Sequence, residues 1–183
     1  AAVGFTPEEE EPPMAETKSQ DAITLLKEDH RKVEELFEQF EKAKGDGRKE
    51  KLALEICKEL TIHTMLEEEI FYPACEGKVE EDLLKESFVE HDAAKLLIAE
   101  IEAGEPSDDF FDSKVKVLKE EIEHHVEEEE MPKKGLFAQA READLDMKAI
   151  GDQLARRKAQ LQEEIKSTGL PAPETTTMEE VDV

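Results

Sequence analysis

The chain has 183 residues, of which 38% are hydrophobic and 40% charged, and its formal net charge is -25. This length suits one domain with tails, and the apolar content suffices for a helical bundle but not for a thick sheet sandwich. The surplus of carboxylates argues against nucleic acid and anionic membranes as partners, because phosphate binding needs clustered Lys and Arg. No segment approaches the ~20 consecutive apolar residues of a membrane span, and no basic-then-apolar leader is visible, so we expect a cytoplasmic protein.

Apolar residues recurring at steps of three and four predict amphipathic helices along most of the chain. The run of Pro and Glu in residues 1–18 cannot bury enough apolar surface to fold and predicts a disordered acidic arm. Four helices are then predicted over about residues 21–44, 48–71, 79–103 and 108–130, with glycine or proline at or near their ends. A looser stripe predicts a fifth helix over about 144–166, and the Thr-, Pro- and Glu-rich residues 167–183 predict a disordered tail.

Four amphipathic helices joined by short loops bury their apolar stripes most simply as an up-down-up-down bundle. We therefore predict an all-α four-helix bundle, with an additional C-terminal helix packed alongside it or capping one end, within residues 19–166. Cys57 and Cys75 are the only cysteines and do not form a CxxC motif. For these two residues we expect a reduced, structural role.

Four histidines and two glutamates interrupt the apolar stripes at positions that should face inward. Continuing each stripe at helical spacing gives positions 23, 26, 30, 33, 37 and 40; 53, 56, 60, 63, 67 and 70; 84, 87, 91, 94, 98 and 101; and 111, 115, 118, 122, 125 and 129. The histidines and glutamates at these positions are His30, His63, Glu67, His91, His125 and Glu129. His124 falls about 100° from the stripe and should face elsewhere.

The same spacing repeats in the two halves of the chain, each with a lone histidine followed by His-x-x-x-Glu. A helix places residues i and i+4 on one face, where an imidazole and a carboxylate can reach a common ion. Taken alone, each such residue is usually a hydrogen-bonded core histidine or part of a solvated acidic face. Six together favour a metal, because burying each unpaired group costs on the order of several kcal/mol. Mixed imidazole and carboxylate donors suit iron or manganese, with zinc possible, and two carboxylates can bridge two ions.

Four segments resemble the hemerythrin-like, or HHE cation-binding, family across about residues 21–165. They are LLKEDHRKVEELF around His30, HTMLEEEIFYP from His63, VEHDAAKLLIAEIE around His91 and VLKEEIEHHVEEEE around His125. The resemblance implies a four-helix bundle around an oxygen-bridged centre of two non-haem iron ions, with Glu67 and Glu129 as bridging carboxylates. Manganese or zinc is the less favoured alternative.

Two departures from the oxygen-carrying hemerythrins bear on function. Those proteins use five histidines, including a His-x-x-x-His pair on the third helix, whereas Lys95 stands four residues after His91 here. The carriers also have an Asp at i+5 on the fourth helix, where this chain has Glu129 at i+4. Glu130 occupies the i+5 spacing and is the rival ligand.

We expect a protein that binds O2 or NO for sensing, storage or detoxification, with peroxide as a further small ligand. A di-iron oxidase or peroxidase, and a protein of iron homeostasis or iron-centre repair, are the alternatives. Binding ranks ahead of catalysis because no sequence feature identifies a pocket for an organic substrate. A metal-free structural bundle is the remaining possibility, and the sequence identifies no protein partner.

Overall fold

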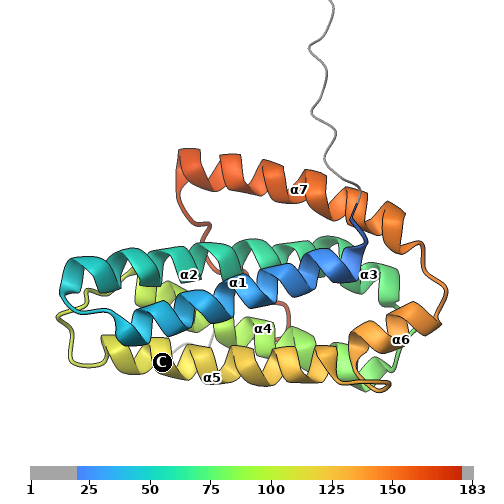
Figure 1. Ribbon diagram of the computed structural model, residues 1–183, viewed down its shortest axis with the longest axis horizontal. Coiled ribbons are helices and arrows are strands. Elements are labelled where there is room, and N and C mark those ends of the chain that lie inside the picture. The colour runs from blue at the N-terminus through green and yellow to red at the C-terminus, as the bar shows by residue number, and fades with distance from the viewer. Residues whose placement is uncertain (1–19, 179–183) are drawn as a thin grey trace, which may run out of the picture.

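The computed structural model describes residues 20–178, which fold into helices without any strand. The elements are α1 (Ala22–Lys42), α2 (Asp46–Leu66), η1 (Glu67–Phe71), α3 (Tyr72–Cys75), α4 (Glu81–Glu102), α5 (Phe111–Glu130), α6 (Leu136–Glu142) and α7 (Met147–Thr168). Figure 1 shows α1, α2, α4 and α5 side by side as an up-down-up-down bundle. The predicted all-α bundle is confirmed, and the arm predicted for residues 1–18 lies outside the described residues.

Local sequence explains where the bundle helices begin and end. The Asp21 carboxylate caps α1 by accepting a hydrogen bond from the Thr24 amide, at 3.2 Å. Gly45 precedes α2 with φ at 86°, a backbone conformation that costs glycine little because it has no Cβ. The fourth bundle helix, α5, ends at Glu130, two residues before Pro132, which lacks the amide hydrogen needed to continue a helix.

Two helices lie outside the four-helix bundle. The additional C-terminal helix predicted from the sequence is α7, which packs along α1 and α2 and buries Leu154 and Leu161 (Figure 1). The short helix α6 packs on α5 at the end of the bundle and buries Leu136 and Phe137. The sequence pattern had not assigned this segment, because seven residues carry too few turns to show a helical period.

The buried apolar side chains form two clusters, one toward each end of the bundle. One contains Leu26, Leu66 and Phe71 together with residues of α6 and α7. The other contains side chains from the opposite halves of the bundle helices, including Phe37 and Leu118. His30, His63 and His91 fall, along their own helices, between side chains of the two clusters, whereas His125 and Glu129 lie in the last two turns of α5, whose core side chains belong to the second cluster. The core is therefore divided by a polar layer.

The two cysteines lie in different clusters, Cys75 in the first and Cys57 in the second. Both are free thiols, and burial raises the pKa of each to about 12. A thiol that stays protonated is a poor nucleophile and metal ligand, in agreement with the structural role predicted for them. Within residues 20–178, no helix combines the length and the apolar character needed to cross a membrane.

Residues 169–178, which we call the C-terminal strap, form no regular structure but lie against the bundle. The backbone amides of Thr176, Thr177 and Met178 donate to the buried carboxylate of Asp92, at 2.6–3.2 Å. The Lys95 ammonium donates to the backbone carbonyl of Glu174, at 3.0 Å. This stretch belongs to the tail predicted for residues 167–183, of which residues 179–183 lie outside the described part of the chain. The buried carboxylate of Asp92 supplies the acceptor that the amides of the strap need.

The close packing of α7 on the start of α1 depends on a glycine. A Cβ at Gly151 would overlap the carbonyl oxygen of Gln20 and lie 2.9 Å from the Ala22 nitrogen. We expect Gly151→Ala to lower the free energy of unfolding by about 1–3 kcal/mol, because backbone rather than a flexible side chain must move. Urea denaturation followed by circular dichroism measures the change.

Gly47→Ala is the matched control, since a Cβ at Gly47 in α2 would meet nothing within 4 Å. Alanine there should leave stability unchanged or raise it by up to about 1 kcal/mol, through its better helix propensity. Equal stability of the two variants would contradict the proposed close contact between α7 and α1.

Candidate metal centre

The six predicted polar residues meet in the layer between the two apolar clusters. Their side chains are 0–5% exposed. All four histidines turn Nε2 toward the middle, where His30 Nε2 lies 3.0 Å from His63 Nε2 and His91 Nε2 lies 3.2 Å from His125 Nε2.

The two glutamates lie between these histidine pairs. The Oε2 atom of Glu67 lies 3.3 Å from His63 Nε2 and 3.2 Å from His91 Nε2. The Oε2 atom of Glu129 lies 3.4 Å from His30 Nε2 and 3.6 Å from His125 Nε2. Each carboxylate thus lies within 3.6 Å of one histidine of each pair, and Glu67 also lies 3.9 Å from His125 Nε2, an arrangement compatible with two ions that share both carboxylates.

The donor atoms are spaced as metal ligands are. Metal bonds to imidazole nitrogen and carboxylate oxygen of about 2.0–2.2 Å place neighbouring donors roughly 3 Å apart. Two groups of donors lie within 4.8 Å of one another, one comprising His30, His63, Glu67 and Glu129 and the other comprising Glu67, His91 and His125. In addition, Glu67 Oε1 and Glu129 Oε2 are buried without a hydrogen-bond partner among the described residues. Buried carboxylate oxygens rarely lack partners, so these residues fit a cation between them.

The carboxylates also make the layer favourable for positive charge. Burial lowers the pKa of His63, but the carboxylates of Glu67 and Asp29 outweigh it and raise that pKa to about 10. The pKa of His125 is raised well above its usual value in the same way, by Glu129, Glu67 and Glu90 against burial. Conversely, the histidines hold the pKa of Glu67 well below its usual range, although burial opposes them. A metal ion would take the place of the protons that these groups attract.

A second ring of carboxylates faces the other nitrogen of each histidine. His30 Nδ1 lies 2.7 Å from Glu130 Oε1, and His125 Nδ1 lies 2.7 Å from Glu90 Oε2. Further pairs join His91 Nδ1 to Glu68 Oε1 at 3.0 Å and, more loosely, His63 Nδ1 to Asp29 Oδ2 at 3.8 Å. A carboxylate at Nδ1 keeps the proton on that atom, so that Nε2 presents its lone pair to the centre.

Basic side chains in turn hold three of these outer carboxylates. Arg31 contacts Glu130 at 2.7 Å, Lys95 contacts Glu68 at 2.8 Å, and Lys158 of α7 pairs with Asp29. Lys95 is the residue that stands where an oxygen carrier has a further histidine. Its ammonium acts through Glu68 and therefore supports His91 indirectly.

Tyr72 also reaches the centre, and the sequence pattern did not predict this. Its hydroxyl oxygen lies 3.1 Å from Glu67 Oε2, 3.0 Å from Glu129 Oε1 and 3.2 Å from His91 Nε2. Burial, together with the Glu129 and Glu67 carboxylates, raises the pKa of this hydroxyl well above its ordinary value, so it stays protonated. Tyr72 therefore offers a fixed proton between the two bridging positions.

A π-helical turn puts Tyr72 there. The second helix was predicted to continue to residue 71, but its α-helical part ends at Leu66 and the wider turn η1 follows. The Tyr72 amide donates to the Glu67 carbonyl, five residues back, which brings Tyr72 toward the face occupied by Glu67. The same turn leaves Ile70 only half-buried, although it was predicted to face inward, and buries Phe71 instead.

A small cavity adjoins the histidines. Its volume is about 10 Å³, close to the minimum that holds one water molecule. The lining combines the four histidines and Asp29 with Thr64 and the apolar side chains of Val33, Leu60, Ile122 and Val126. Space of this size and character suits a diatomic or similarly small ligand rather than an organic substrate.

The structure distinguishes Glu129 from Glu130, the two residues that the sequence left as alternative ligands. Glu129 is buried in the layer, whereas its rival Glu130 faces the outer nitrogen of His30. His124 points away from the centre with 61% of its side chain exposed, as expected, and lies between Glu90 and Glu128 on the surface. All six predicted residues are brought together, and Tyr72 and the outer carboxylates Asp29, Glu68 and Glu90 are added to them.

Comparison with known proteins agrees with this geometry. Residues 21–140 match the family described as the hemerythrin HHE cation binding domain. The chain belongs to this family. The HHE match spans the four bundle helices and every one of the six converging residues, and the family together with the His and Glu clusters supports a metal cofactor.

Two individual proteins resemble this HHE domain. A protein named DNA nickase from Nostoc sp. (strain PCC 7120) is 32% identical over 111 residues, which make up 61% of this chain and 31% of that protein. The chain thus spans less than a third of that relative's length. The crystal structure of an HHE cation binding domain-containing protein from Mycobacterium kansasii covers 82% of this chain and 94% of its own, with a TM-score of 0.67 and 21% identity. At this identity the likeness shows a common fold.

The neighbouring histidines of α5 give a matched test of the inward face in this HHE domain. We expect His125→Ala to lose bound metal, because Nε2 of His125 is one of the converging donors. His124→Ala should retain its metal, since that imidazole is on the surface. Metal per chain, measured by elemental analysis after purification, distinguishes the two, and equal loss would contradict the assigned face.

Proposed function

We propose that the protein holds two non-haem iron ions and binds a small oxidant or diatomic ligand, O2, NO or peroxide, for sensing, storage or detoxification. The supporting observation is that Glu67 and Glu129 each lie within 3.6 Å of one nitrogen of both histidine pairs, with a cavity of about 10 Å³ against the same histidines. His30 and His63 would hold one ion, His91 and His125 the other, and Glu67 and Glu129 would bridge them. When bound, iron supplies an electron-rich centre with open positions for such ligands.

The surrounding residues supply what a reversible binding site needs. Val33, Leu60, Ile122 and Val126 line the cavity and keep bulk water from it. The protonated hydroxyl of Tyr72 can donate a hydrogen bond to negative charge at the bridging positions. Hydrogen bonds to outer carboxylates fix the imidazole rings of His30, His91 and His125, so these donor atoms need little reorganisation when the ligand enters or leaves.

Catalysis is the second candidate, and Tyr72 is the observation that favours it. A buried hydroxyl beside both bridging carboxylates could deliver a proton to a peroxide that is being reduced, as an oxidase or peroxidase requires. DNA nicking, the activity in the name of the Nostoc relative, is not carried over, since this chain covers 31% of that protein. Its net charge of -25 also repels a phosphate backbone.

Iron loading followed by ligand titration tests this proposal. We expect two iron ions per chain after anaerobic reconstitution with ferrous salt, and changes in the visible spectrum when O2 or NO is added. Return of the starting spectrum when the gas is removed supports reversible binding, whereas rapid consumption of peroxide favours the enzyme. A chain that takes up no iron under these conditions overturns the proposal.

Metal should also stabilise the fold, because it relieves repulsion among buried carboxylates. Binding to the folded state alone raises the free energy of unfolding by about 4 kcal/mol when free metal is about 1,000 times its dissociation constant. Thermal melting with ferrous ion and then with excess chelator measures this difference. His125→Ala is the control, in which the melting temperature should not respond to metal.

A further inference from the structure

Every residue that lines the ligand cavity is buried, so a ligand must pass between packed side chains to reach it. Of the residues that line it, the histidines and Asp29 are tied to the carboxylates and cations described above, and four others are core aliphatics. Thr64 is different, because it lines both this cavity and a larger pocket on the surface of the bundle. Among residues 20–178, no other side chain is common to the linings of these two spaces.

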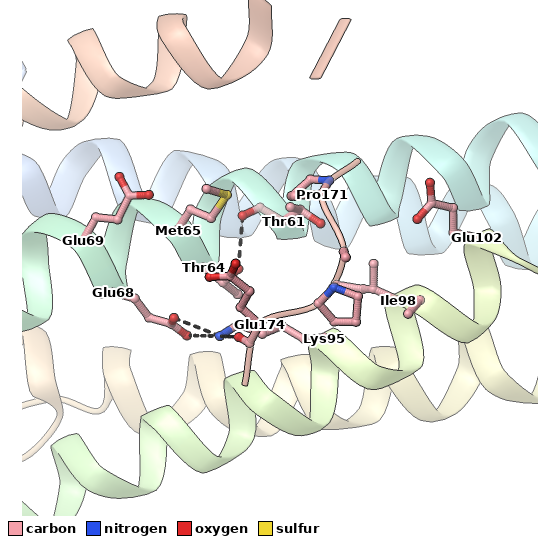
Figure 2. Close-up of a pocket in the computed structure, with 13 residues that line it drawn as sticks. Thr61, Thr64, Met65, Glu68, Glu69, Lys95, Ile98, Glu102, Pro171 and Glu174 are labelled. Carbon is pink, nitrogen blue, oxygen red and sulfur yellow. Dashed lines mark hydrogen bonds and ion pairs between the residues drawn. The ribbon is translucent and has the colours of Figure 1, made fainter. Parts of the chain in front are cut away.

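The larger pocket lies between α2, α4 and the C-terminal strap (Figure 2). It has a volume of about 290 Å³. Thr61, Thr64 and Met65 line it from α2 and Lys95 and Ile98 from α4, and Pro171, Ala172 and Pro173 of the strap form its outer wall. The bonds from the strap to Asp92 and from Lys95 to Glu174 hold that wall in place.

At Thr64 a single side chain separates the ligand cavity from the larger pocket. Thr64 is 2% exposed, and its hydroxyl donates to the carbonyl of Thr61 at 3.1 Å, one turn back on the same helix (Figure 2). Its one hydroxyl proton is therefore used within α2, so the side chain hinders passage mainly by its bulk. A comparable pocket of about 230 Å³ between α1 and α5, lined by Phe37, Phe40 and Val115, shares no residue with the cavity.

The negative charge of the larger pocket favours neutral ligands over anions. Glu68, Glu69, Glu102 and Glu174 contribute to its lining, against the single ammonium of Lys95. Excess negative charge along an entrance lowers the local concentration of anions. Dissolved NO, O2 and hydrogen peroxide carry no charge and are not subject to this penalty.

From these observations we infer that the pocket under the C-terminal strap is the entrance by which neutral diatomic ligands reach the metal centre, and that Thr64 is the barrier that sets the rate and size limit of entry. This inference rests on the proposed function, since it needs a ligand that binds at the centre. To the proposed function it adds a route of ligand entry, the residue Thr64 as the control of selectivity, and a preference for neutral over anionic ligands.

Variants at Thr64 test the inference through rates rather than amounts. A barrier changes the association and dissociation rates by the same factor and leaves the dissociation constant unchanged, unlike a residue that merely shapes the site. We expect Thr64→Ala to speed both rates of NO exchange with the ferrous protein about tenfold, equivalent to about 1.4 kcal/mol of barrier. Thr64→Ile should slow both, and Thr64→Val, of the same shape, should match the unaltered protein. Stopped-flow mixing measures association, and trapping of released NO measures dissociation.

The control for general loosening of the core is Val115→Ala, which truncates a buried side chain that lines the separate pocket between α1 and α5. It should leave both rates unchanged. Equal acceleration in Val115→Ala and Thr64→Ala, or a changed dissociation constant with an unchanged association rate in Thr64→Ala, would overturn the inference.

A readout without metal separates failure of the inference from failure of the proposed function. The chain has one tyrosine and no tryptophan, so its intrinsic fluorescence comes from Tyr72, beside His91 in the centre. Quenching by dissolved O2 should be faster in Thr64→Ala and slower in Thr64→Ile, with Val115→Ala unchanged. If the chain takes up no iron but these differences remain, only the proposed function fails. If iron binds and neither NO exchange nor quenching responds to Thr64, only the entrance fails.

Discussion

The structure depends on placing two carboxylates and four imidazoles inside an apolar bundle. Buried in this way, Glu67 and Glu129 would destabilise the fold unless positive charge lay among them. The bundle meets this constraint by confining the polar groups to one layer between two apolar clusters. Within the layer each carboxylate faces imidazole nitrogens, and beyond it each imidazole faces an outer carboxylate. The result is alternating charge from the middle of the core to the surface, which a cation at the centre completes.

Helical period alone was enough to predict the bundle and to bring the six polar residues together. That inference works because an α-helix turns by a constant angle, so apolar neighbours such as Leu60 indicate where His63 points. It fails where the turn changes. The π-helical turn η1 adds a residue between Glu67 and Tyr72, and the pattern then predicts Ile70 on the inside in place of Phe71. Pro73, which cannot donate a hydrogen bond to the preceding turn, was the one local sign of irregularity.

The outer carboxylates could have been read from the sequence, because they extend its internal repeat. An acidic residue precedes each lone histidine, as in Asp29-His30 and Glu90-His91, and a second glutamate follows each His-x-x-x-Glu. In the structure Asp29 faces His63 and Glu90 faces His125, so each of these acids serves the second histidine of its own repeat. By contrast, Glu68 faces His91 and Glu130 faces His30, so each of these glutamates serves the lone histidine of the other repeat. Adjacent residues on a helix point about 100° apart. In the pairs Glu67–Glu68 and Glu129–Glu130, the first glutamate therefore faces the candidate metal centre and the second faces the outer nitrogen of a histidine. The pair α1 and α2 is thereby linked to the pair α4 and α5 through the residues of the candidate metal centre.

The aromatic neighbours break this approximate symmetry. Tyr72 stacks on His91, with ring centroids 5.3 Å apart, and Phe137 stacks on His30 in the other half, at 5.7 Å. Each ring stacks on a lone histidine, but only Tyr72 has a hydroxyl. The hydroxyl of Tyr72 therefore contacts His91 as well as both glutamates, while the ring stacked on His30 offers no polar group. Any ligand that gains negative charge on binding is stabilised unequally at the two ends of the site, so two metal positions with nearly equivalent donors would differ in reactivity. The asymmetry originates in η1, which places Tyr72 at the candidate metal centre.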